Sequence, residues 1–126
     1  MDKDSGLVIG IADDKQSRTW DFGWLDMYPV VNDRLGDRAV LVTYDKVSMT
    51  AVLFDRDLEG RELSFEERDG VVVDRETGSE WDRLSGVATQ GALKGKRLSQ
   101  LPGIVSDSAA WEMFHPLNTS WRPKDE

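Results

Sequence analysis

The sequence predicts a mainly β (α+β) fold, a small antiparallel β domain of short strands and hairpins with one C-terminal helix. The first observation behind this prediction is that turn-forming residues interrupt short apolar runs at intervals of about 8–12 residues. The second is a single segment of helical character, residues 108–114. The length of 126 residues suits a single domain, 1–126, with an ordered core over about residues 7–119 and a disordered tail over 122–126.

The N-terminal part predicts a hairpin. Leu7–Ile11 is an apolar, β-branched run, Asp13–Ser17 is polar and turn-like, and Arg18–Phe22 alternates polar and aromatic residues as a half-buried strand does. Trp24–Met27 fits a short helical or irregular element. This element ends before Pro29, because a residue that precedes proline avoids helical geometry.

The centre of the chain predicts a second hairpin. Val30 and Val31 form a brief strand, and Asn32–Asp37 has the composition of a turn. Ala39–Tyr44 and Ala51–Phe54 are apolar, β-branched runs that we expect to be strands on either side of a polar connection, residues 45–50.

The next segments continue the alternation of strand and turn. Glu62–Phe65 alternates polar and apolar residues, Glu66–Gly70 is a turn, and Val71–Val73 is a strand. Asp74–Ser79 is another turn, after which Trp81 opens a short strand.

The C-terminal helix is predicted from its boundaries. Ser106 or Asp107 supplies the N-cap, and Pro116 stands just beyond the C-terminal end. Trp111 and Phe114 are three residues apart, so we expect both to face the sheet.

Charge and composition exclude several classes of function. The chain has 16 Lys+Arg against 24 Asp+Glu, a net charge of −8, which argues against nucleic acid binding through a broad basic face. The absence of cysteine excludes disulfides, thiolate metal sites and a cysteine nucleophile within this chain. The apolar runs are far shorter than the roughly 20 residues of a membrane span, so we expect no transmembrane segment. The charged N-terminus does not resemble a signal peptide, so we expect a protein that is either cytoplasmic, or extracytoplasmic with its leader removed, and the sequence leaves both open.

Two candidate sites have simpler interpretations. Carboxylates between residues 55 and 66 match most positions of a calcium loop, but Glu62 stands where an apolar residue anchors such loops and the flanks resemble strands. We therefore expect a solvated β-turn. The single histidine, His115, stands at the predicted helix end, where it serves as a C-cap. With no nucleophile elbow and no phosphate or dinucleotide loop, the sequence predicts no catalytic residue, no metal and no cofactor.

We expect most of the tryptophans to pack in the core and not to stack on a ligand. Trp20, Trp24, Trp81 and Trp111 lie in or beside predicted strands and the helix, where aromatic residues usually pack inward. Trp121 lies outside these elements in a polar segment. It is therefore the candidate for contact with a partner protein.

Two central motifs resemble the bacterial family catalogued as Domain of Unknown Function 3179. The first motif joins Val40–Tyr44 to Ala51–Arg56 across six variable residues, and the second is Asp74–Trp81. The resemblance spans roughly residues 7–119 and includes further positions in the second half of the chain: Gly86, Ala88, Gly91, Gly95, Leu98, Pro102, Trp111, His115 and Pro116.

The departures from that family concern its reactive residues. In the family the first strand of the motif is followed by Cys-Pro-Leu-Cys-Gly-Thr-Ala, a Cys-x-x-Cys pair suited to redox or metal chemistry. Here Asp45 and Ser48 occupy the two cysteine positions, and Lys46 and Met49 replace the proline and glycine. Met27–Pro29 replaces a typical Trp-His-Glu. The resemblance therefore implies a divergent member that has lost its thiol or soft-metal chemistry.

The sequence thus favours a non-catalytic accessory or structural subunit that binds another protein, with a homo-oligomer also open. An alternative is an enzyme or small-molecule-binding module that uses an oxygen-rich remnant of the family's cleft. A third interpretation is a binder of a basic partner through the acidic surface. The residues that would line the remnant cleft are Tyr28, Asn32, Asp33, Tyr44, Asp45, Ser48 and Thr50.

Overall fold

The computed structural model describes residues 4–124 and confirms the mainly β class, with 47% of residues in strands and 11% in helices. The chain divides into two compact units, which are described separately. The first unit combines the N-terminal part of the chain up to Tyr28 with the C-terminal part from Pro102 onward. The second unit is Pro29–Leu101.

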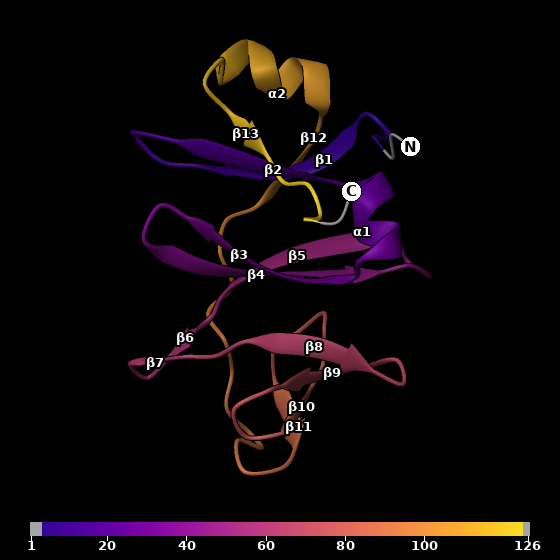
Figure 1. Ribbon diagram of the computed structural model, residues 1–126, viewed down its shortest axis with the longest axis vertical. Coiled ribbons are helices and arrows are strands. Elements are labelled where there is room, and N and C mark those ends of the chain that lie inside the picture. The colour runs from indigo at the N-terminus through magenta and orange to yellow at the C-terminus, as the bar shows by residue number, and fades with distance from the viewer. Residues whose placement is uncertain (1–3, 125–126) are drawn as a thin grey trace. The chain divides into compact units, whose positions relative to one another are not determined.

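The first unit is a four-stranded sheet with two short helices (Figure 1). Its neighbouring strands are antiparallel, except that the last one pairs in parallel with β2. In sheet order the strands are β12 (Ile104–Asp107), β1 (Leu7–Ala12), β2 (Ser17–Asp21) and β13 (Thr119–Ser120). The helices are α1 (Phe22–Met27) and α2 (Ser108–Phe114).

Helix α2 is the predicted C-terminal helix. Asp107 is its N-cap, and its carboxylate accepts hydrogen bonds from the backbone N–H groups of Ala109 and Ala110. Trp111 is the one buried residue of the helix and lies against Gly10 of β1, where a Cβ atom would come within 2.7 Å of the indole ring. Glycine at this position lets the helix approach the sheet closely.

The expectation that Phe114 faces the sheet together with Trp111 is wrong. Phe114 is 81% exposed. The side chains of residues three apart on a helix point in similar but not identical directions, so one can be buried while the other is exposed. The contact of Trp111 with Gly10 fixes the rotation of this short helix and directs Phe114 to solvent.

Helix α1 lies where the sequence predicts a short element that is either helical or irregular. The structure therefore has this helix in addition to the predicted C-terminal one. Asp21 caps it by accepting a hydrogen bond from Gly23 N at 2.7 Å. Trp24 and Leu25 are buried. Neither helix of residues 4–124 has the length and apolar composition needed to cross a membrane.

The second unit contains a three-stranded sheet, a four-stranded sheet and a small hairpin, all antiparallel. The three-stranded sheet has the order β3 (Val30–Leu35), β4 (Arg38–Asp45) and β5 (Thr50–Asp55). The four-stranded sheet has the order β11 (Ala88–Gln90), β10 (Glu80–Trp81), β9 (Val71–Asp74) and β8 (Phe65–Arg68). The hairpin pairs β6 (Asp57–Leu58) with β7 (Arg61–Glu62).

Two segments predicted as turns are strands. Asn32–Leu35 continues β3 beside β4, and Glu66–Arg68 forms most of β8 beside β9. In both cases a partner strand with a strong apolar pattern decides the conformation, because strand propensity depends on the neighbouring strand more than on the residue itself. The turns are shorter than predicted and centre on Gly36 and Gly70, both of which have positive φ.

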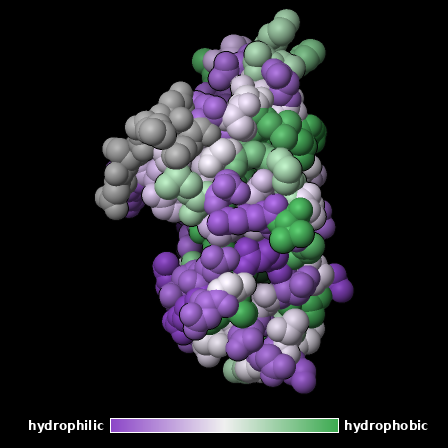
Figure 2. Space-filling view, turned by 90° about the vertical axis from the view of Figure 1, so that its right-hand side faces the viewer, coloured by the Kyte–Doolittle hydropathy of each residue, from purple (hydrophilic) through white to green (hydrophobic). Residues whose placement is uncertain are grey.

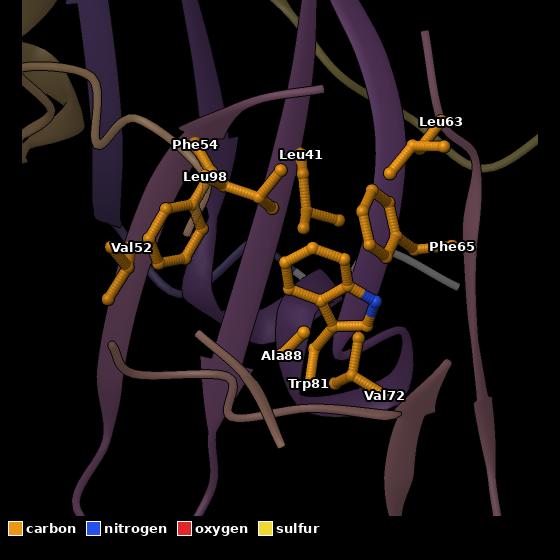
Figure 3. Packing of buried hydrophobic residues seen from close by; sticks show 9 residues of the cluster. All are labelled: Leu41, Val52, Phe54, Leu63, Phe65, Val72, Trp81, Ala88 and Leu98. Atoms are coloured by element: carbon orange, nitrogen blue, oxygen red, sulfur yellow. The ribbon is translucent and has the colours of Figure 1, made fainter. Parts of the chain in front are cut away.

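The core of the second unit lies between its two larger sheets and contains Trp81 at its centre (Figure 3). The rings of Trp81 and Phe65 are 5.6 Å apart and meet edge to face, the geometry that aromatic pairs favour. The buried residues of this cluster are Leu41, Val52, Phe54, Leu63, Phe65, Val72, Trp81, Ala88 and Leu98.

The C-terminal segment is anchored to the first unit as far as it is described. Trp121 N donates to Thr19 O, and Arg122 forms an ion pair with Asp4 at 2.7 Å. Pro123 is buried. The disordered tail predicted over residues 122–126 includes positions 125 and 126, which lie outside the described residues.

Candidate functional site

The β4–β5 turn holds the two positions where the resemblance places the family's cysteine pair. Asp45 and Thr50 are opposite each other in the hairpin. Asp45 Oδ1 accepts a hydrogen bond from Val47 N at 3.1 Å, and Ser48 Oγ lies 3.0 Å from Asp45 Oδ2 and 2.8 Å from Thr50 Oγ1. The three polar side chains therefore bind one another and brace the turn.

Met49 closes this turn in a left-handed conformation, with φ of 55°. Only glycine adopts this region without a steric cost, and for other residues the cost is about 1–2 kcal/mol. The hydrogen bonds of Asp45 and Ser48 offset that cost and stabilise the turn.

Asn32 lies elsewhere in the second unit and ties two sheets together. Its Nδ2 donates to Phe65 O at 2.7 Å, and its Oδ1 accepts from Phe65 N at 2.8 Å. The side-chain amide thus pairs with the backbone of β8 as a neighbouring strand would. Asn32 is opposite Leu41 on β4, four residues from Asp45, which corresponds to about 13 Å of strand.

The other candidate cleft residues are also dispersed. Asp33 Oδ1 accepts a hydrogen bond from Arg34 N, and the carbonyl oxygen of Asp33 accepts one from Arg56. Tyr44 is buried, and its carbonyl oxygen accepts from Arg83 at 3.0 Å. The structure thus brings Asp45, Ser48 and Thr50 together in one turn, whereas Asn32 is engaged with a different strand.

Tyr28 belongs to the first unit, where it contacts two tryptophans. Its ring is 6.3 Å from that of Trp24 and 5.9 Å from that of Trp121, the latter edge to face. Trp121, the predicted interface residue, is half-buried and packs edge to face with Tyr28. Trp20, Trp24, Trp81 and Trp111 are buried, as the sequence predicts.

The segment that resembles a calcium loop is a β-hairpin. Asp57 Oδ1 accepts a hydrogen bond from Gly60 N at 2.9 Å, and Glu59 and Gly60 both have positive φ, as in a tight two-residue turn. Glu66 accepts hydrogen bonds from the side chain of Arg68, which lowers the pKa of its carboxyl. Among residues 4–124 no group of three or more His, Cys, Asp or Glu side chains is placed to hold a metal ion.

The second family motif, Asp74–Trp81, is organised by hydrogen bonds to the buried carboxylate of Asp74. Asp74 is fully buried and accepts hydrogen bonds from Thr77 N at 2.6 Å, from Thr77 Oγ1 and from Trp81 Nε1 at 2.8 Å. Ser79 Oγ contacts Thr77 Oγ1 at 2.7 Å and accepts from Leu93 N. These residues fix the β9–β10 turn and the central tryptophan of the core.

His115 caps α2, as predicted. Its backbone N–H donates to Trp111 O, and its ring lies 4.3 Å from the indole of Trp111. The histidine therefore closes the helix and stacks on its buried residue.

The most exposed apolar surface of the first unit was not predicted from the sequence. Met113 and Phe114 are each 81% exposed, and Leu117, just beyond the helix, is 88% exposed. Figure 2 shows hydrophobic side chains, in green, protruding in the region of α2. Ala109 and Ala110 are also exposed, one helical turn before Met113 and Phe114. We call these five residues the apolar face of α2.

A groove of about 200 Å³ lies beside this face. One wall consists of Phe114, Pro116 and Leu117, and the other is the β1–β2 turn, residues 13–17. That turn carries Asp13 and Asp14. Backbone N–H donation from Lys15, together with a hydrogen bond from the Gln16 side chain, lowers the pKa of the Asp13 carboxyl and keeps it charged. Lys15 lies on the same turn, so the groove joins an apolar wall to a polar one that carries two carboxylates and one ammonium group.

The sequence of the first unit carries most of the chain's net negative charge, with 5 Lys+Arg against 10 Asp+Glu.

Comparison with known protein families assigns the chain to one of them. The profile of the family described as "Protein of unknown function (DUF3179)" matches residues 2–119. The chain belongs to this family. No curated protein and no solved structure matches the chain significantly.

Proposed function

We propose that this member of the DUF3179 family is a non-catalytic accessory or structural subunit that binds another protein through the apolar face of α2. The observation that carries the proposal is that this helix buries only Trp111, whereas Met113 and Phe114 face solvent. Contiguous exposed apolar side chains on a small protein typically mark a contact surface.

The energetics of this surface support binding. Burying one large apolar side chain contributes about 1.5–3 kcal/mol, so Met113, Phe114 and Leu117 together supply several kcal/mol of favourable free energy. Part of that gain offsets the entropy lost on association. Aromatic anchors that fill a pocket dominate such interfaces, which makes Phe114 the residue expected to contribute most.

The groove indicates the chemistry of the partner. On the wall opposite the apolar residues, Asp13 and Asp14 outnumber Lys15, and this wall belongs to the more acidic part of the chain. A partner segment that places Lys or Arg beside apolar side chains complements both walls. We therefore propose a basic and apolar segment as the occupant.

The polar residues of the predicted remnant cleft support this proposal over a small-molecule site. Asn32 is committed to the backbone of Phe65, and Asp45 is committed to Val47 and Ser48. Polar groups that satisfy one another in this way have a structural role that requires no ligand.

Site-specific photocross-linking in native cells tests the proposal. A photoreactive residue at position 114 should give a discrete cross-linked protein species, and Met113→Asp in the same chain should abolish it. The same photoreactive residue at Gln90, which is exposed on β11, is the matched control and should give no such species. Equal cross-linking patterns from positions 114 and 90 would contradict a docking role for α2.

A further inference from the structure

The chain itself carries a segment with the chemistry expected of the occupant. At the β4–β5 turn of the second unit, Val47 is 96% exposed and Met49 is 61% exposed, and Lys46 precedes them. We call Lys46, Val47 and Met49 the β4–β5 tip. It combines one positive charge with two exposed apolar side chains.

Hydrogen bonds at its base brace the tip. The hydrogen bonds of Asp45, Ser48 and Thr50 brace it from the base, and Met49 is fixed in the left-handed region. At the adjoining end of β4, Arg83 donates to Tyr44 O. A preorganised loop loses little conformational entropy on binding, so its apolar contacts contribute more fully to affinity.

We propose that a second copy of this chain occupies the α2 groove and docks its β4–β5 tip there. Val47 and Met49 would pack on Phe114 and Leu117, and Lys46 would face Asp13 and Asp14. This inference rests on the proposed function, because it requires the apolar face of α2 to be a docking surface. It assigns that surface a partner.

The charges favour this head-to-tail contact over a symmetric contact between two α2 helices. Beside the face the carboxylates of Asp13, Asp14 and Glu112 outnumber the one ammonium group, Lys15, so a symmetric contact would bring together two surfaces of the same net charge. The tip brings Lys46 to the same carboxylates. Each copy offers one groove and one tip, so the contact builds a reciprocal dimer, a chain or a closed ring.

Two complementary variants test the geometry of the contact by sedimentation velocity. Val47→Asp disables the tip and leaves the groove intact, whereas Phe114→Asp disables the groove and leaves the tip intact. Both side chains are highly exposed, so we expect circular dichroism and urea midpoints close to wild type. We expect wild type to self-associate, each variant alone to self-associate about 30-fold more weakly, and an equimolar mixture of the two variants to form heterodimers.

A charge-reversal pair tests the role of Lys46. Lys46→Glu and Lys94→Glu change the net charge equally, and Lys94 is exposed on a loop near β11. We expect Lys46→Glu to weaken self-association about 10-fold and Lys94→Glu to leave it nearly unchanged. Equal effects of the two substitutions would contradict the proposed pairing with Asp13 and Asp14.

The remaining outcomes separate the two proposals. Self-association of Val47→Asp at wild-type strength, with loss in Phe114→Asp, would overturn tip docking in favour of a symmetric α2 contact. A monomeric wild type that still gives a cross-link from position 114 to a different protein would overturn self-docking and leave the proposed function standing. A monomeric wild type with no cross-link from position 114 would overturn both.

Discussion

Removal of the Asn32 side chain is the perturbation whose effect follows most directly from the structure. Asn32 was a candidate for a remnant ligand cleft, but its amide makes two hydrogen bonds to the backbone of Phe65, at 2.7 and 2.8 Å. In Asn32→Ala both backbone groups of Phe65 lose these partners. Phe65 is itself buried in the core, so water replaces the lost hydrogen bonds poorly.

The cost can be worked out from these two contacts. A buried polar group left without a partner costs about 1–3 kcal/mol, and two such groups at a partly buried site give about 2–4 kcal/mol. For a chain of this length that loss lowers Tm by about 10 °C. Asn32→Asp should cost a similar amount, because a carboxylate provides no donor for Phe65 O.

Urea denaturation followed by tryptophan fluorescence measures this effect. We expect a lower midpoint with an unchanged m-value, since the surface exposed on unfolding stays the same. Gln90→Ala, an exposed substitution on β11, serves as the control and should change stability by less than about 0.5 kcal/mol. An Asn32→Ala midpoint equal to that of the control would refute the structural role of this amide and favour the cleft interpretation again.

The remaining predictions concern single side chains in the second unit. Met49→Gly should stabilise the protein by up to about 1 kcal/mol in urea denaturation, because glycine relieves the left-handed strain, and a lower stability would contradict this. Asp74→Asn should destabilise by about 2–3 kcal/mol, because Thr77 N and Trp81 Nε1 donate to different oxygens of the carboxylate and an amide replaces one of these oxygens with a donor; an unchanged urea midpoint would argue against this network. Hydrogen bonds from Ser85 lower the pKa of the Asp82 carboxyl below its ordinary value of 3.8. Its contribution to stability is therefore present above that value and is lost as the pH falls through the lower folded-state pKa, so Asp82→Asn should flatten the acid limb of a stability–pH profile.

Several strands and helix α2 could be predicted from the sequence, because neighbouring residues in the sequence specify them. Ala39–Tyr44 and Ala51–Phe54 are apolar, β-branched runs, and both are strands. Asp107 and Pro116 bracket α2 as a cap and a stop. Asn32–Leu35 could not be predicted in this way, since its polar residues become a strand only through pairing with β4, which lies later in the chain.

The candidate surface could not be predicted because it depends on one distant contact. The orientation of α2 is set by Trp111 against Gly10, residues about 100 positions apart in the sequence. Without that contact the spacing of Trp111 and Phe114 suggests a shared inward face. A local signal did exist, since Ala109 with Met113 and Ala110 with Phe114 form an apolar stripe at helical spacing. The sequence alone does not say whether such a stripe faces the sheet or solvent.

Oxidative footprinting of the methionines tests the central claim, that the apolar face of α2 is covered in the working state, most directly. Met113 is 81% exposed, and Met27, at the end of α1, is 51% exposed and serves as the internal reference. In dilute purified protein both should react readily with peroxide. In the native assembly we expect the oxidation rate of Met113 to fall about 10-fold while that of Met27 is unchanged. Equal rates for Met113 in the two states, relative to Met27, would contradict the account.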